Sequence, residues 1–171
     1  MLKKKMLDAL NDQINAEYYS SYLYLSMAAW SESVNLKGLA NWFKVQALEE
    51  MVHVMKFFAF VLDRKGEVEL KPIEGPPTKW ASPVAAFEAT LSHEQYITSR
   101  INNLVDLALA ESDHATNTLL QWFVNEQVEE EASADQMLSQ LKLAGDTPAA
   151  LFMIDRELGA RVFTPPAGAA P

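Results

Sequence analysis

Long stretches of the chain carry apolar side chains at the spacing of an amphipathic α-helix, and this periodicity is what most restricts the fold. The first stretch, from about residue 4 to 32, has Leu7, Leu10, Ile14, Tyr18, Tyr22 and Leu25 at such intervals. The second stretch has Leu39, Trp42, Phe43, Val45, Leu48, Val52, Met55, Phe58 and Leu62. Two more helices are expected from about 83 to 111 and 113 to 144, and no stretch of useful length alternates as a strand does. The sequence therefore predicts an all-α fold.

Cap and stop signals mark the ends of these helices. Ser82-Pro83 and Thr147-Pro148 are each typical of an N-cap followed by proline at the first helical position. The second of these pairs opens a short fifth helix that ends near Gly159. Gly145 ends the fourth helix, and Lys65-Gly66 ends the second with a basic last turn and a glycine beyond it.

The connection between the second and third helices, residues 67–81, is long and contains Pro72, Pro76 and Pro77. Its fifteen residues reach roughly 50 Å when extended, whereas a helix of about 28 residues is roughly 42 Å long. The loop can therefore run the length of a bundle and make the second and third helices parallel. The first–second and third–fourth connections are short, so each joins antiparallel neighbours.

Composition excludes several classes of function. The chain has 23 acidic and 14 basic residues and a formal net charge of -9, which disfavours nucleic acids and anionic membranes as partners. It has no cysteine, which removes disulfides, thiolate zinc sites and iron–sulfur clusters. No apolar run is long enough to span a bilayer, so a soluble, cytoplasmic protein is expected. We expect one domain over residues 1–163 and a flexible Pro/Ala-rich tail over 164–171.

Carboxylates interrupt the apolar stripes near the middle of all four long helices. The positions are Glu17 on the first helix, Glu50 and His53 on the second, Glu94 on the third, and Gln127 and Glu130 on the fourth. A glutamate in a helix usually faces solvent, but four mid-helix occurrences in one consistent topology are hard to attribute to chance. In a bundle with the long crossover, these positions meet at the same level.

Buried carboxylates need counter-charges, because an unpaired buried charge costs several kcal/mol or is neutralised by a shifted pKa. Lysine and arginine are scarce at these levels of the helices, so bound divalent metals are the expected counter-charges. Glutamate oxygens with one imidazole suit Fe(II) and Mn(II) better than copper or a structural zinc. One glutamate on each of two helices, with Glu/His pairs spaced i, i+3 on others, is the arrangement of di-iron carboxylate bundles.

Four motifs together resemble the prokaryotic non-haem ferritins. They are Asn15-Ala16-Glu17-Tyr18-Tyr19 with Tyr24, Glu49-Glu50-Met51-Val52-His53, His93-Glu94-Gln95, and the block from Leu120-Gln121-Trp122-Phe123 to Glu129-Glu130-Glu131. The resemblance extends through Asp155-Arg156-Glu157-Leu158 in the short fifth helix. It implies a ferritin-like four-helix bundle with a long second-to-third helix crossover and a short fifth helix.

The resemblance also implies a function and a set of roles. The family members are ferroxidases, that is Fe(II):oxygen oxidoreductases, which use dioxygen or peroxide and store Fe(III) mineral inside a hollow shell of 24 subunits. Carried over by position, Glu17, Glu50 and His53 would bind the first iron, and Glu94 and Glu130 the second, with Glu50 bridging. Gln127 would sit beside the pair, Glu49, Glu126 and Glu129 would form a third iron site, and Tyr24 would supply one electron.

Several alternatives are weighed against this interpretation. Haem bacterioferritins resemble the chain in having a methionine at Met51, but they place a second Glu-x-x-His where this chain has Gln127 and Glu130. Haem is therefore not expected, and Met51 is assigned to packing. A rubrerythrin-like peroxidase usually adds a cysteine-rich iron domain, an oxygenase needs a substrate pocket, and a metal-free scaffold leaves the buried carboxylates without a reason. His93 and His114 are not expected to be ligands, and Trp30, Trp42, Trp80 and Trp122 are expected to pack.

Overall fold

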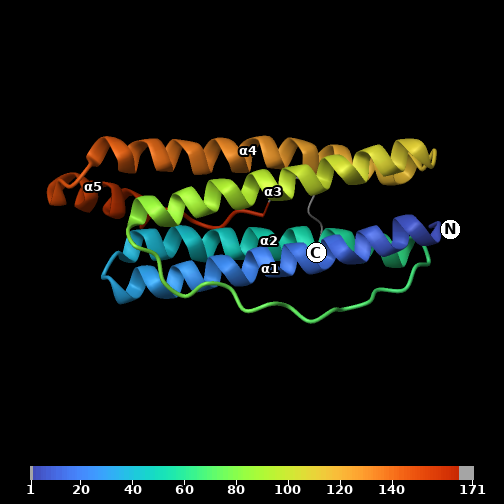
Figure 1. The fold of residues 1–171 in the computed structure, drawn as a ribbon, viewed down its shortest axis with the longest axis horizontal. Helices are drawn as coiled ribbons and strands as arrows, with labels where there is room; N and C mark the ends of the chain where they lie inside the picture. The colour runs from blue at the N-terminus through green and yellow to red at the C-terminus, as the bar shows by residue number, and fades with distance from the viewer. Residues whose placement is uncertain (1, 166–171) are drawn as a thin grey trace.

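The computed structural model describes residues 2–165 and contains five helices. They are α1 (Lys4–Ser33), α2 (Lys37–Asp63), α3 (Pro83–Ala110), α4 (His114–Ala144) and α5 (Pro148–Leu158). Figure 1 shows the four long helices side by side, with α5 at one end of the bundle. The all-α expectation is confirmed, and no helix in the described part combines the length and apolar content needed to cross a membrane. Most of the tail expected over 164–171 lies outside the described residues.

The chain is organised as two antiparallel hairpins, α1–α2 and α3–α4, joined by the long connection. In Figure 1 this connection leaves the end of α2, runs back along the outside of the bundle and enters α3 near the level at which α2 began. As a result α2 and α3 are parallel, as the loop length predicted. The crossover between the two hairpins is confirmed.

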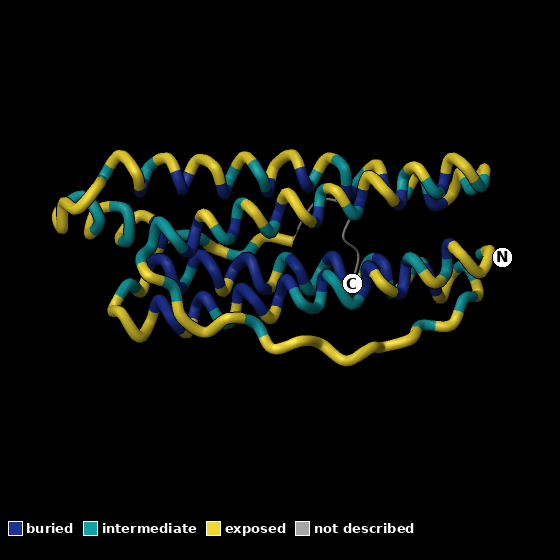
Figure 2. Tube along the Cα trace, in the orientation of Figure 1, coloured by how far each residue is buried: buried dark blue, intermediate teal, exposed yellow. Residues whose placement is uncertain are grey.

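The crossover has no secondary structure of its own, and side chains of α1 hold it in place. Asn11 donates a hydrogen bond of 3.0 Å to the carbonyl of Glu67 and accepts one of 2.9 Å from the N–H of Glu69. Further along, the hydroxyl of Ser26 donates to the carbonyl of Pro77 at 2.6 Å. Figure 2 shows that most of this segment is exposed, so these bonds replace the partners that a strand or helix would supply.

The predicted helix starts are correct, although the two cap signals act differently. Ser82 caps α3, because its Oγ accepts a hydrogen bond of 3.1 Å from the N–H of Ala85. α5 begins at Pro148 as expected, but the side chain of Thr147 makes no capping hydrogen bond. Proline at the first helical position is therefore the signal shared by both starts.

The end of α2 corrects the role expected of Gly66. Lys65 adopts the left-handed conformation with φ 56°, and the N–H of Gly66 donates a hydrogen bond of 2.9 Å to the carbonyl of Val61. Glycine is suited to Gly66 for a different reason, since a Cβ there would lie 2.8 Å from Cδ1 of Leu7. The close approach of α1, rather than a positive φ, explains this glycine.

Two apolar clusters fill the bundle, one toward each end. Tyr24, Phe43 and Phe87 belong to the cluster near α5, together with Trp42 and Leu138. The cluster at the other end includes Ile14, Phe57, Ile97, Leu120 and Phe123. On each long helix the buried glutamates fall between the positions that supply the two clusters, so a polar layer crosses the middle of the core.

Five apolar residues that periodicity assigned to buried stripes are about half exposed. They are Tyr22, Leu25, Leu48, Met55 and Leu62, with exposed fractions of 49% or 50%. The expectation was wrong because the stripes were drawn too wide. Leu48 lies two residues from Glu50, about 200° around the helix, so it cannot share the buried face.

Candidate metal centre

Three expected ligands from the first hairpin meet in the polar layer. Glu17 of α1 and Glu50 and His53 of α2 each offer one ligand atom, and these atoms lie within 4.8 Å of one another. All three side chains are buried. Nδ1 of His53 is 3.3 Å from Oε2 of Glu50. The mid-helix level predicted from the sequence therefore brings these three residues together.

Several atoms of this cluster lack a hydrogen-bond partner among the described residues. They are Oε2 of Glu17, Oε2 of Glu50 and Nε2 of His53. A buried polar atom without a partner costs on the order of 1–3 kcal/mol, and more when the group is charged. A divalent cation would satisfy both carboxylate oxygens at once, and Nδ1 of His53, which faces Glu50, is the ring nitrogen placed to join them. Two carboxylate oxygens and an imidazole nitrogen suit Fe(II).

The second hairpin supplies the facing half of the layer. Glu94 of α3 accepts hydrogen bonds from the hydroxyl of Tyr24 and, at 3.2 Å, from Nε2 of Gln127. Glu130 of α4 accepts one of 2.7 Å from Nε2 of Gln46. Both carboxyl groups are buried. They do not belong to the tight cluster of the first hairpin, but they lie close enough to interact electrostatically with Glu50.

Burial makes these carboxyl groups hold protons. It raises the pKa of Glu130 to about 8 and the pKa of Glu94 to about 7, although hydrogen bonds from Tyr24 and Gln127 lower the latter. The pKa of Glu50 is raised well above its usual range, first by burial and then by the neighbouring carboxylates Glu94, Glu17 and Glu130. Glu50 therefore lies close enough to carboxylates of both hairpins to interact with them electrostatically.

Amide side chains next to the ligands were missed by the sequence analysis. Gln13 donates a hydrogen bond of 2.8 Å to Oε1 of Glu17 and accepts one of 2.9 Å from Nε of Arg100. Gln46 holds Glu130 in the same way. Gln13 and Gln46 each lie four residues before an expected ligand, Glu17 and Glu50. For Gln13 the available signal was its place one helical turn before Glu17, whereas Gln46 binds Glu130 on another helix and had no such signal.

The histidines outside the cluster have other surroundings. His93 is mostly buried, its Nε2 lies 2.8 Å from Oγ of Ser20, and its ring meets the Tyr24 ring edge-on at 6.0 Å. Burial lowers the pKa of His93 to about 4, so the ring is neutral. His114 is exposed as the first residue of α4, where Asp113 is the capping residue. The Trp122 ring packs edge-on against His53 at 5.5 Å, and Met51 packs at the edge of the apolar cluster around Phe57.

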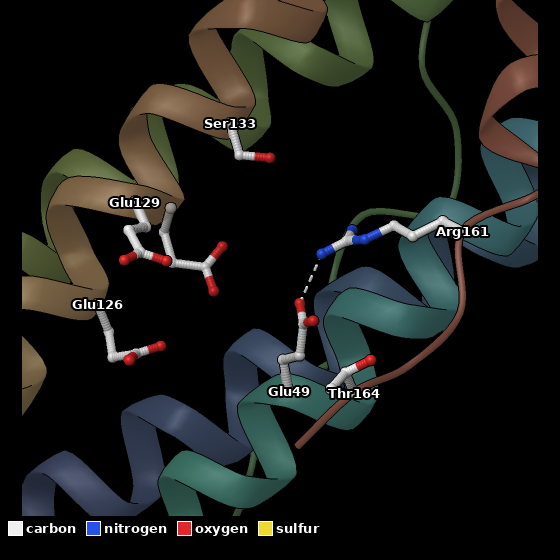
Figure 3. Close-up of a pocket in the computed structure, with 7 residues that line it drawn as sticks. Glu49, Glu126, Glu129, Ser133, Arg161 and Thr164 are labelled. Carbon is white, nitrogen blue, oxygen red and sulfur yellow. Dashed lines mark hydrogen bonds and ion pairs between the residues drawn. The ribbon is translucent and has the colours of Figure 1, made fainter. Parts of the chain in front are cut away.

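A second group of carboxylates surrounds a cavity beside the centre. Glu49, Glu126 and Glu129 line this cavity of about 360 Å³ together with Glu130 and Arg161, and Figure 3 shows their side chains around it. We call it the outer carboxylate pocket. Glu130 is shared between the pocket and the buried layer, so the two adjoin. Burial raises the pKa of Glu49 and of Glu126.

Comparison with known proteins decides the family. The family described as the ferritin-like domain matches residues 7–144. The chain belongs to the ferritin family. Relatives of this ferritin include the bacterial non-heme ferritins of Staphylococcus aureus (strain USA300) and Bacteroides fragilis (strain 638R). The first is 39% identical over 163 residues, covering 95% of this chain and 98% of the relative. The second is 42% identical over 161 residues, covering 94% and 100%.

Solved structures agree with the fold of this ferritin. The open pore ferritin of the archaeon Archaeoglobus fulgidus is 51% identical, superimposes with a TM-score of 0.94, and covers 95% of this chain and all of its own. A closed form of that ferritin, engineered by site-directed mutagenesis, is 52% identical with a TM-score of 0.95 and covers 96% of this chain. Iron storage is the function this family supports, and the Glu17–Glu50–His53 cluster is compatible with a di-iron site.

Proposed function

We propose that this ferritin subunit is a ferroxidase that binds two Fe(II) ions in the polar layer between its hairpins. The observation that carries the proposal is the buried cluster of Glu17, Glu50 and His53, in which one carboxylate oxygen of each glutamate lacks a partner. Glu94 and Glu130 complete the layer from the opposite hairpin, each oriented by an amide. The first iron is assigned to Glu17, Glu50 and His53, and the second to Glu94 and Glu130.

The reaction follows from this ligand set. Two Fe(II) ions each give one electron to dioxygen, which takes up two protons and leaves as hydrogen peroxide, while both irons become Fe(III). Carboxylates favour the more highly charged product, so oxidation becomes easier inside the layer than in water. Two metals held close together can act on one oxygen molecule at the same time. Glu50, which interacts with carboxylates of both hairpins, bridges the irons and sets their separation.

Gln127 and Tyr24 act on the second half of the centre. Both donate hydrogen bonds to Glu94, so they hold its carboxylate in one orientation for metal binding. Gln127 lies beside the iron pair. The resemblance assigns Tyr24 one electron, which is used only when dioxygen is reduced to water: two electrons then come from the iron pair, one from the third iron and one from Tyr24, and four protons are taken up. These roles are carried over from the resemblance and are supported here by the contacts with Glu94.

The outer carboxylate pocket is proposed as the third iron site. Glu49, Glu126 and Glu129 supply its ligands, and the shared wall at Glu130 gives iron a short route between the pocket and the buried layer. Glu50 and Glu49 are adjacent in sequence but serve different compartments. A cation leaving the centre would therefore pass from one set of carboxylates to the next.

The storage part of the proposal concerns assembly. We propose a cage of 24 subunits, in the cytoplasm, that keeps the Fe(III) mineral inside. The Archaeoglobus fulgidus relative is described as an open pore ferritin, which supports assembly into a shell. The half-exposed apolar side chains of α1 and α2, Tyr22, Leu25 and Met55 among them, are of the type that contacts between subunits bury.

The test is stopped-flow absorbance of ferric species after Fe(II) is added in air, titrated by iron per subunit. The unaltered protein is expected to give a fast phase that saturates near two or three irons per subunit, followed by slow growth that stays soluble. Glu50→Ala is expected to abolish the fast phase with its helical content intact. Glu88→Ala, which removes a surface carboxylate paired with Lys142, is the matched control and should keep it.

Two outcomes would lead to other functions. Unchanged fast oxidation in Glu50→Ala would reject the assignment of the centre. A trace no faster than buffer in the unaltered protein, with no iron bound after growth in iron-rich medium, would favour a scaffold. A need for a reductase and an organic substrate would instead indicate an oxygenase.

A further inference from the structure

The segment after α5 returns across α2 and places an arginine in the outer carboxylate pocket. Nη2 of Arg161 donates a hydrogen bond of 2.7 Å to Oε2 of Glu49. The same guanidinium lies over the ring of Trp42, 4.9 Å from its centroid, and Nη1 lies 3.4 Å from the carbonyl oxygen of Trp42. Figure 3 shows the side chain reaching toward Glu49 from this segment.

The backbone of this segment is fastened to α2 independently of the guanidinium. Nδ2 of Asn41 donates hydrogen bonds to the carbonyl of Leu158 at 3.1 Å and to the carbonyl of Arg161 at 2.9 Å. Arg161 is therefore delivered to Glu49 by a fixed backbone. The arginine can give up Glu49 and still remain beside Trp42 through its other contacts.

Charge in the pocket is strongly one-sided. Four glutamates line it, and Arg161 is the one positively charged side chain among the described residues that do so. In Figure 3, Glu126 and Glu129 project from α4 on the side opposite Glu49 and Arg161. A guanidinium stays charged at any physiological pH, so a metal ion that approaches Glu49 meets a positive charge already bound there.

We propose that Arg161 is a resident counter-ion that competes with divalent cations for Glu49 and so sets the affinity of the outer carboxylate pocket. This inference rests on the proposed function of the pocket as a cation site. Without Arg161, the carboxylates of Glu49, Glu126 and Glu129 would bind a divalent cation tightly and retain it. With Arg161 in place, a cation must displace the guanidinium to bind, and the guanidinium returns to Glu49 when the cation leaves. The pocket then binds cations reversibly and releases them, rather than retaining them.

A simpler role for Arg161 is to anchor the segment after α5. Both roles use the same contacts, but they predict different effects on cation binding. If Arg161 is only an anchor, replacing it should lower the affinity of the pocket for cations or leave it unchanged, because the wall of the cavity loosens. A competing counter-ion makes the pocket bind cations more tightly when its charge is removed.

The test is a calorimetric titration of the metal-free assembled protein with Zn²⁺, a divalent cation that does not change oxidation state. Glu126→Gln is measured first, and the class of zinc sites that it weakens is assigned to the outer carboxylate pocket. Arg161→Gln is expected to tighten that class about tenfold, within the range usual for coupled sites. Arg161→Lys keeps the positive charge and is expected to bind zinc like the unaltered protein. Arg156→Gln, at an exposed arginine of α5, makes the same charge change away from the pocket and should have no effect.

Each contrary result has its own meaning. Unchanged or weaker zinc binding in Arg161→Gln, with the Glu126→Gln effect present, overturns the counter-ion role and leaves the third site standing. Equal tightening in Arg161→Lys also overturns it, because charge is then not the cause. If Glu126→Gln weakens no class of sites, the pocket is not a cation site and both ideas fall.

A zinc-soaked crystal of the unaltered protein tests the inference without any substitution. Zinc bound to Glu49 with the contact between Arg161 and Glu49 broken is the expected result. Zinc bound to Glu49 with that contact intact would overturn the proposal.

Discussion

The hydroxyl of Tyr24 on α1 donates a hydrogen bond to Oε1 of Glu94 on α3, in the middle of the buried polar layer. This bond crosses from one hairpin to the other. It also lowers the pKa of Glu94, which burial otherwise raises. Protons and cations compete for the carboxyl group of Glu94. The hydroxyl of Tyr24 shifts this competition toward cations because it lowers the pKa of Glu94.

Replacing Tyr24 with phenylalanine is expected to raise the pKa of Glu94 above its value of about 7. Metal binding requires the carboxylate form, so protons compete more strongly and the pH midpoint of Zn²⁺ binding moves to higher pH. Zinc titrations at a series of pH values measure this midpoint. Tyr22→Phe, at an exposed tyrosine of the same helix, is the control. An unmoved midpoint in Tyr24→Phe would show that the hydroxyl does not act on Glu94.

Removing metal is expected to make the protein's stability depend on pH. Folded Glu94 and Glu130 keep protons up to pH values of about 7 and 8, whereas the unfolded chain releases them near 4.5. Between these values the folded state binds more protons, so the free energy of unfolding falls as pH rises, by up to about 1.4 kcal/mol per pH unit for each proton.

Thermal unfolding from pH 5 to pH 8, with chelator and with saturating Zn²⁺, measures this dependence. The melting temperature of the metal-free protein should fall across the range. With zinc it should not fall, because the cation replaces the protons and binds better as their competition weakens. Parallel curves in the two conditions would contradict the assignment of Glu94 and Glu130 as ligands.

Gly38 is expected to be the least replaceable of the glycines in the described part of the chain. A Cβ there would lie 1.5 Å from the carbonyl oxygen of Asp155 on α5, while Oδ1 of Asp155 accepts a hydrogen bond of 2.9 Å from the N–H of Leu39. Gly38→Ala must push α5 away from α2, at a cost of about 1–3 kcal/mol. Urea unfolding measures the loss. Gly75→Ala, where nothing lies within 4 Å of the added Cβ, should leave stability unchanged, and equal effects at both sites would refute the argument.

Asn11 is expected to contribute more to stability than Asn15, although both bind the crossover. Asn11 is buried and satisfies one carbonyl and one N–H of the crossover, whereas Asn15 is more exposed and only donates, to the carbonyls of Lys71 and Pro72. Asn11→Ala should lower the free energy of unfolding by about 2 kcal/mol, and Asn15→Ala by less. Urea unfolding of the two variants decides the order, and the reverse order would contradict it.

The fold and the meeting of Glu17, Glu50 and His53 could be predicted because they depend on spacing along single helices. Helical periodicity located the long helices, and the i, i+3 spacing put Glu50 and His53 on one face. The length of the crossover then fixed the topology, which brought mid-helix positions to one level. Each of these steps depends on the spacing of residues within one helix or on the extended length of the crossover.

What could not be predicted depends on contacts between distant segments. The partner of Gln46 is Glu130 on another helix, and Arg161 is fastened to Asn41 over 120 positions of sequence. Lys65 rather than Gly66 adopts the left-handed conformation, and Leu7 of the distant α1 packs close to Gly66. None of these relationships leaves a periodic trace in the sequence.

The arrangement of two hairpins has a consequence for how the subunit holds together. The covalent link between the halves is one exposed crossover, and the proposed ligands are divided between the halves, with Glu17 and His53 on one side and Glu94 and Glu130 on the other. Iron bound by these proposed ligands would therefore link the two hairpins, which the backbone joins only through the crossover. The first iron ions that bind would therefore stabilise each subunit against separation of its two hairpins.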